Sequence, residues 1–276
     1  MSIRAQKRLT GPLAALFALT AIAQPVSAEN SKRFQSEIPA ARVDYWQKRQ
    51  AEILAQIHDT KDLSGVKLVF IGDSITDFWH LDENPWFKGK WMGKQIWDES
   101  FGEASAENRA FNLGISGDRI EHVLYRLMPA ADGGMGMLDR ADLQPEFMVI
   151  MLGINNTFDG EEPLADSLFN GVKVALDAAH RAKPNAKIIL QSILPTDDPV
   201  KNAKTVLVVN QRLAALTSEP DYYRFTTYLN LYSSFVDQTG AQRKELFVDA
   251  LHPNRDGYHV WRDMLVRKLD AVRKSN

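Results

Sequence analysis

Three side chains that together support nucleophilic catalysis lie far apart along the chain. Ser74 follows a Gly-Asp turn, whereas Asp249 and His252 lie three residues apart near the C-terminus. A serine hydroxyl is a poor nucleophile until a base removes its proton, and neutral imidazole can do so near neutral pH. A carboxylate on the same loop can hold the ring Nδ1–H and leave Nε2 facing the serine. The pattern therefore indicates a nucleophile, a base and an orienting carboxylate.

Two other segments contain groups that could stabilise a negatively charged oxygen. Gly114 and Gly117 surround a turn between an apolar run and a helical pattern, and glycine allows backbone N–H groups to approach a ligand closely. Asn155 and Asn156 follow another apolar run, and a side-chain amide there could donate to the same oxygen. Ser74 itself lies where a helix begins, which also favours negative charge.

Each of these motifs also has an ordinary structural interpretation. Asp73 or Ser74 could cap a helix, Asp118 could cap the next one, and the two asparagines could close a loop as an Asx turn. An Asp-x-x-His pair is a weak signal by itself. The order of the motifs, with the first three each directly after an apolar run, favours the catalytic interpretation.

Short apolar runs alternate with helical patterns from Val66 onward. Five runs predict strands: Lys67 to Ile71, Ala110 to Leu113, Phe147 to Leu152, Lys187 to Ile193 and Tyr223 to Leu231. Three apolar stripes with a period near 3.6 predict helices, in the regions 120–127, 164–179 and 258–272. The alternation predicts a flavodoxin-like, three-layer α/β/α domain around a parallel sheet of about five strands. Ligands bind such sheets at the carboxyl ends of the strands, where the candidate residues lie.

The first 28 residues have the features of an export signal. Three basic residues precede an apolar run from Leu13 to Ala23, and Val26-Ser27-Ala28 provides a small-residue cleavage site. The apolar run is too short to span a bilayer, although an uncleaved anchor is the alternative. We therefore expect a signal peptide over 1–28, a secreted mature chain in the periplasm or outside the cell, and no stable membrane insertion after cleavage.

Two further regions follow the expected leader. Residues 29–62 are polar with spaced apolar positions, which predicts a helical extension, interrupted at Pro39, that packs outside the main sheet. Residues 63–276 contain the alternating pattern and are expected to form the catalytic domain. Neither an internal repeat nor a Pro- or Ser-rich linker divides them.

Composition removes several classes of function. The chain has 276 residues and no cysteine, which excludes disulfide scaffolds, thiolate metal sites and cysteine nucleophiles. Loss of the leader removes only basic charge and leaves an acidic chain, so nucleic-acid binding has no electrostatic basis. The six histidines form no metal-binding motif such as H-E-x-x-H, so we expect neither a metal nor another cofactor. Small molecules or neutral glycans remain as partners, and the oligomeric state is open.

Four of the six tryptophans fall between Trp79 and Trp97. They could form a wall beside an acyl pocket, where flat rings suit a sugar or an aromatic alcohol. A local hydrophobic cluster that fixes a long loop is the favoured interpretation, so these residues are not candidate site residues.

Taken together, the motifs resemble the conserved blocks of the GDSL, or SGNH, serine esterase family. The similarity runs from about Val66 to the last helix and is greatest to the catalytic subunits of platelet-activating factor acetylhydrolase and their bacterial relatives. Three segments carry it: Gly72-Asp73-Ser74-Ile75-Thr76, Asn112 to Asp118 running into the helix that follows, and Gly153-Ile154-Asn155-Asn156. The Asp249-x-x-His252 pair completes the set.

The resemblance assigns a role to each candidate residue. It implies that Ser74 is the nucleophile, His252 the base and later the acid, and Asp249 the residue that orients the ring. It also implies an oxyanion hole made by the backbone N–H groups of Ser74 and Gly117 and the side-chain amide of Asn155.

The chain departs from the family at two positions and leaves the substrate open. Many relatives have Gly or Thr at the position of Ile154, and many have Asp at that of Asn156, which puts the loop geometry in question more than the chemistry. The resemblance implies a serine esterase for short acyl groups, such as acetyl on a saccharide. The alternatives are a lysophospholipase or thioesterase of the same family, or a glycan-binding module without turnover.

Overall fold

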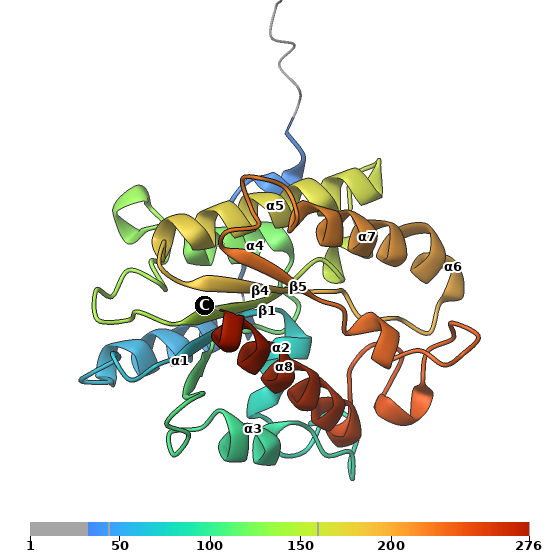
Figure 1. The fold of residues 1–276 in the computed structure, drawn as a ribbon, viewed down its shortest axis with the longest axis horizontal. Helices are drawn as coiled ribbons and strands as arrows, with labels where there is room; N and C mark the ends of the chain where they lie inside the picture. Colours follow the sequence, from blue (N-terminus) through green and yellow to red (C-terminus); the bar gives the residue numbers. More distant parts are fainter. Residues whose placement is uncertain (1–32, 44, 159, 276) are drawn as a thin grey trace, which may run out of the picture. The chain divides into compact units, whose positions relative to one another are not determined.

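A five-stranded parallel sheet lies at the centre of the fold in the computed structural model, which describes residues 33–43, 45–158 and 160–275 (Figure 1). The strands are β1 (Leu68–Gly72), β2 (Ala110–Asn112), β3 (Phe147–Met151), β4 (Lys187–Gln191) and β5 (Thr226–Leu229). Four of them lie within the predicted runs, and β1 extends one residue beyond its predicted run, to Gly72. Their order, β2-β1-β3-β4-β5, is the flavodoxin-like order, and the chain reverses direction across the sheet between β1 and β3. The predicted fold class is confirmed.

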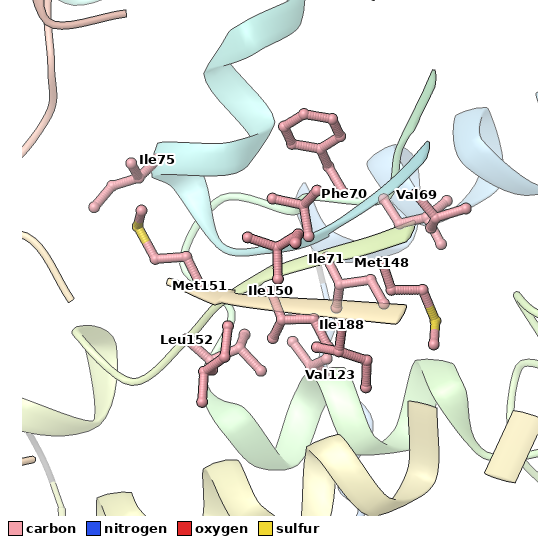
Figure 2. Packing of buried hydrophobic residues seen from close by; sticks show 14 of the residues in the cluster. Val69, Phe70, Ile71, Ile75, Val123, Met148, Ile150, Met151, Leu152 and Ile188 are labelled. Atoms are coloured by element: carbon pink, nitrogen blue, oxygen red, sulfur yellow. The ribbon is translucent and has the colours of Figure 1, made fainter. Parts of the chain in front are cut away.

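The strands carry apolar side chains on both faces because helices cover both faces of the sheet. One layer holds α4 (Ile120–Leu127), α5 (Leu164–Ala182) and α7 (Leu207–Leu216), and the other holds α2 (Ser74–Asp77), α3 (Lys94–Ser100) and α8 (Arg255–Ser275) (Figure 1). Figure 2 shows Ile75 of α2 on one side of the strands and Val123 of α4 on the other. A short helix, α6 (Pro199–Lys201), and a π-helical turn over Asn202–Val206 precede α7.

The three predicted apolar stripes form the buried faces of α4, α5 and α8. The stripe of α5 is buried at Leu168, Val172, Ala175, Leu176 and Ala179. That of α8 is buried at Tyr258, Trp261, Leu265 and Leu269. These faces close the core from opposite sides of the sheet.

The region before β1 contributes no strand to the sheet and packs against helices of both layers. It contains a 3₁₀ turn at Gln35–Glu37 and the helix α1 (Tyr45–Asp59), separated by an irregular segment that includes Pro39. The α1 residue Trp46 is buried and packs on Tyr125 of α4, and Arg49 bonds to Asp77 at the end of α2. Because α4 and α2 lie on opposite faces of the sheet, α1 links the two helical layers.

The expected signal peptide, residues 1–28, lies outside the described residues. Among the residues that the structure describes, no helix combines the length and apolar character needed to cross a membrane.

Candidate active site

Ser74 lies just beyond the carboxyl end of the internal strand β1, at the first position of α2. Asp73 caps this helix, because its Oδ1 accepts the Ile75 backbone N–H at 3.0 Å. The turn needs glycine at position 72, since a Cβ there would lie 2.0 Å from the Thr76 hydroxyl. The capping interpretation therefore applies to Asp73, and the Ser74 hydroxyl is available for another partner.

That partner is His252, on the loop before α8. The Ser74 Oγ and His252 Nε2 atoms are 2.9 Å apart, and His252 Nδ1 lies 2.8 Å from Asp249 Oδ2. A carboxylate can only accept a hydrogen bond, so Nδ1 carries the proton and Nε2 has its lone pair toward the serine. Hydrogen bonds thus connect Ser74, His252 and Asp249 in series, although Ser74 lies far from the other two in the sequence.

The Asp249 carboxylate is held in its charged form by its own loop. Its Oδ1 accepts backbone N–H groups from Leu251 at 2.8 Å and from His252 at 2.7 Å. Partial burial acts to raise the pKa of Asp249, but the hydrogen bonds from His252 and Leu251 outweigh it and lower the pKa below its ordinary value. The residue can therefore orient the imidazole as an anion.

The glycine-rich turn after β2 lies beside α2. Gly117 is exposed and has a φ of +76°, a conformation that favours glycine. The Ser116 N–H donates to Asp77 Oδ2 at 2.9 Å, which ties the turn to α2, the helix that begins at Ser74. Within the described residues, the backbone N–H groups of Ser74 and Gly117 have no hydrogen-bond acceptor.

Asp118 does not cap the next helix, and the capping interpretation of this residue is wrong. The N-cap of α4 is Arg119. The Asp118 carboxylate is fully buried and bonds to Arg126 at 2.7 Å and to Arg42 at 3.0 Å. Arg126 also donates to the backbone carbonyls of Leu113 and Gly72, so it fixes the ends of β2 and β1 together. A carboxylate that neutralises two arginines is better satisfied there than at a helix end.

The two asparagines after β3 have different environments. Asn155 is half-buried, and its Nδ2 donates one hydrogen to the Asp118 carbonyl at 2.7 Å, so a second amide hydrogen remains for a ligand. Asn156 is buried and joins the loop to α4, since its Oδ1 accepts the Ile120 N–H and its Nδ2 donates to Glu121. Asn155 is thus the residue linked to the glycine turn, and Asn156 is a structural residue.

The tryptophan segment divides into a buried part and an exposed part. Trp79 and Trp97 lie in an aromatic cluster with Phe70, which agrees with the favoured interpretation. Trp86 and Trp91 are instead 65% and 48% exposed. The Trp86 ring lies 5.7 Å from Phe78, whose ring lies 4.9 Å from that of His252. Trp86 therefore stands near the candidate site.

Several residues around the site were not identified from the sequence as contributing to it. They are Arg42, Asp77, Phe78, Trp86 and Arg126. Asp77 directly follows the serine block Gly72 to Thr76 and could have been found there, whereas nothing in the local sequence pairs Arg42 with a turn more than 70 positions later. Among the described residues, no three His, Asp or Glu side chains are grouped as a metal site.

A serine bonded to a histidine that is bonded to a carboxylate, at the carboxyl edge of a doubly wound sheet, is the arrangement of an α/β serine hydrolase. A model of the GDSL-like lipase/acylhydrolase family matches residues 70–260, more than half of the chain. The chain belongs to this family, and the resemblance seen in its motifs is confirmed. It is a carboxylic ester hydrolase.

Known relatives agree with this assignment. The chain is 28% identical over 207 residues to platelet-activating factor acetylhydrolase IB subunit alpha1 of Rattus norvegicus, covering 73% of this chain and 74% of the relative. A GDSL-like lipase from Bacteroides thetaiotaomicron has the same fold, with a TM-score of 0.58 at 18% identity over 81% of this chain and 98% of the other. A carbohydrate esterase family 3 protein from Talaromyces cellulolyticus has a TM-score of 0.50 at 18% identity, covering 76% and 99%.

Proposed function

We propose that the chain hydrolyses esters through an acyl-serine intermediate on Ser74. Ser74 Oγ attacks the ester carbonyl carbon, and His252 Nε2 takes the hydroxyl proton and passes it to the departing alcohol. Water, activated by the same imidazole, then attacks the acyl-serine and releases the acid. Asp249 holds the Nδ1–H throughout. The 2.9 Å contact between Ser74 Oγ and His252 Nε2 carries this proposal.

Three donors stabilise the negative charge on the tetrahedral intermediate. They are the backbone N–H groups of Ser74 and Gly117 and the second amide hydrogen of Asn155. The absence of an acceptor for the two N–H groups within the described residues supports this role, as does the bond between Asn155 and Asp118. The partial positive charge at the start of α2 acts in the same direction.

The acyl group is short, and an acetylated saccharide is the substrate class that we favour. The relative named an acetylhydrolase and the fold neighbour named a carbohydrate esterase support this choice. Trp86 adds support, because its exposed indole ring, which packs on Phe78 beside His252, offers a flat apolar face to a sugar.

Export to the periplasm or the outside of the cell is also part of the proposal. The basic residues, the apolar run and the Val26-Ser27-Ala28 box support cleavage after Ala28. N-terminal sequencing of protein purified from the producing cells should find Glu29 as the first residue, and an intact N-terminus would contradict cleavage.

Hydrolysis of p-nitrophenyl acetate by the wild type and by Ser74→Ala tests the mechanism. We expect the variant to lose nearly all activity, and equal rates would refute the mechanism. Labelling with a fluorophosphonate followed by peptide mapping should identify Ser74. A series of p-nitrophenyl esters tests the acyl group, since a maximum at about eight carbons or more would favour a lysophospholipase or thioesterase instead.

A further inference from the structure

A segment before the family-matched region lies against the helices behind the glycine turn. We call residues 33–43 the N-terminal strap. The Ser36 hydroxyl donates to the Ser167 carbonyl of α5 at 2.7 Å, and the Ala40 N–H donates to the Glu121 carbonyl of α4 at 2.9 Å. Figure 1 shows the start of the strap next to α5. Two separate helices thus fix the course of the strap as it approaches Arg42.

The Arg42 guanidinium contacts the residues on both sides of Gly117. Its Nη1 donates to the Ser116 carbonyl at 3.1 Å and to Asp118 Oδ1 at 3.0 Å. A Cβ on Gly117 would lie 3.0 Å from Arg42 Nη2, so the guanidinium packs directly against this glycine. Only 24% of the Arg42 side chain is exposed.

The Ser116 carbonyl belongs to the same peptide group as the Gly117 N–H. A peptide group is planar, and in its trans form the C=O and the N–H point in opposite directions. A donor that fixes the carbonyl therefore also fixes the direction of the N–H. The other side of Ser116 is fixed too, because its own N–H donates to Asp77 Oδ2 at 2.9 Å.

The charge of Arg42 acts on the same peptide group. A cation at the carbonyl oxygen polarises the amide and strengthens the N–H as a donor, as expected for connected hydrogen bonds. The Asp118 carboxylate does not need Arg42 to remain paired, because the fully buried Arg126 bonds to it at 2.7 Å. Arg42 and Arg126 both pair with Asp118, and of these two arginines Arg42 is the one that also bonds to the Ser116 carbonyl.

From this arrangement we infer that Arg42 is a positioning residue for the oxyanion hole, acting through the Ser116–Gly117 peptide group. The inference rests on the proposed function, in which the Gly117 N–H binds the oxyanion. It assigns a role in catalysis to a part of the chain that lies outside the family-matched residues 70–260.

Arg42→Met and Arg42→Lys test the inference with p-nitrophenyl acetate as substrate. Loss of a direct oxyanion donor lowers kcat about 10²–10³-fold, so loss of a group that acts on the donor should cost less, on the order of tenfold for Arg42→Met. KM should change less than twofold, because the contact strengthens mainly in the transition state. Acylation and deacylation both use the oxyanion hole, so kcat falls whichever step limits the rate. Arg42→Lys keeps the charge and should recover part of the loss.

Arg212→Met is the matched control. Arg212 is also partly exposed and paired with a carboxylate, Asp166, but it lies on α7 away from the glycine turn. The Arg212→Met variant should have a melting temperature lowered about as much as that of Arg42→Met, and its kcat should be unchanged. Measurements well below both melting temperatures separate a loss of catalysis from a loss of folded protein.

The possible outcomes are distinct. A kcat of Arg42→Met within twofold of wild type, or a loss shared equally by Arg212→Met, would overturn the inference. If Arg42→Met does not fold, a kcat for Arg42→Lys at least threefold below wild type at constant KM supports the inference, and an unchanged kcat overturns it. Wild-type rates in Ser74→Ala would instead refute the proposed function.

Discussion

Asn155 and Asn156 are neighbours in the sequence, yet the structure predicts opposite consequences for their removal. Asn155→Ala deletes an amide whose one hydrogen bond among the described residues is to the Asp118 carbonyl, at 2.7 Å, on the half-buried rim of the site. The loss of this one hydrogen bond should lower the free energy of unfolding by about 1 kcal/mol. The loss of an oxyanion donor should raise the activation free energy by about 2.7–4 kcal/mol, equivalent to about 10²–10³ in kcat.

Asn156→Ala removes two hydrogen bonds from a buried position. It leaves the Ile120 N–H and a Glu121 carboxylate oxygen without their partners, and both of these residues are almost inaccessible to water. Each buried polar group left unpaired costs about 1–3 kcal/mol, so the free energy of unfolding should fall by about 2–6 kcal/mol. The folded fraction should keep kcat within about threefold of wild type, because neither bond reaches the reacting atoms.

The two quantities are measured separately. Initial rates with p-nitrophenyl acetate give kcat and KM, and urea unfolding gives the free energy of unfolding for each variant. The substitution at 155 should change mainly kcat, and that at 156 mainly the urea midpoint. A kcat for Asn155→Ala within fivefold of wild type would remove this residue from the oxyanion hole. An equal loss of kcat in fully folded Asn156→Ala would show that the loop acts as a unit.

Three further substitutions probe the orienting carboxylate, the helix cap and the exposed rings. Asp249→Asn should lower kcat by about 10³–10⁴-fold, because an amide favours the wrong imidazole tautomer; a loss below tenfold in rate assays would contradict this role. Burial raises the pKa of Asp73 to about 7 from 3.8, so the folded state binds its proton more tightly and stability falls as pH rises through that window. Urea unfolding should therefore give Asp73→Asn a free energy of unfolding a few kcal/mol above that of the wild type at pH 8, and a much smaller difference at pH 4. An equal difference at both pH values would contradict the raised pKa of Asp73. Trp86→Ala should lower kcat/KM about tenfold on an acetylated oligosaccharide and leave ethyl acetate unchanged; equal losses on both would exclude sugar stacking.

The strands and the long helices were predictable because their buried positions are occupied by apolar residues in a recognisable pattern. Every residue of β1 and β3 is buried, so no polar residue interrupts their apolar runs. The apolar pattern of the helices α3 and α7 is weaker. In α3 the only fully buried residue is Ile96, and in α7 the consecutive residues Leu207, Val208 and Val209 place apolar side chains on several faces, so no single stripe appears.

The residues of the candidate site could be predicted from the sequence, but the network of contacts around them could not. Ser74, Gly117 and Asn155 each follow a predicted strand. They were indicated together because a parallel sheet brings the carboxyl ends of its strands to one edge. The partners of Asp118 could not be deduced in this way. Capping is a local preference, whereas Arg126 and Arg42 reach this carboxylate through tertiary packing, and the burial of a charge made that pairing necessary.

The sheet order explains how three segments reach the proposed nucleophile, Ser74. β1 lies between β2 and β3, so the turn that carries Ser74 is flanked by the Gly117 turn on one side and by the Asn155 loop on the other. His252 comes from another segment, and α8, the helix that follows it, is fixed to α2, because the buried Tyr258 hydroxyl donates to the Ile75 carbonyl at 2.7 Å. The loop that carries His252 therefore leads into a helix that is anchored beside Ser74. Preorganisation of this kind is what oxyanion stabilisation requires, since donors that must first reorient lose much of their effect.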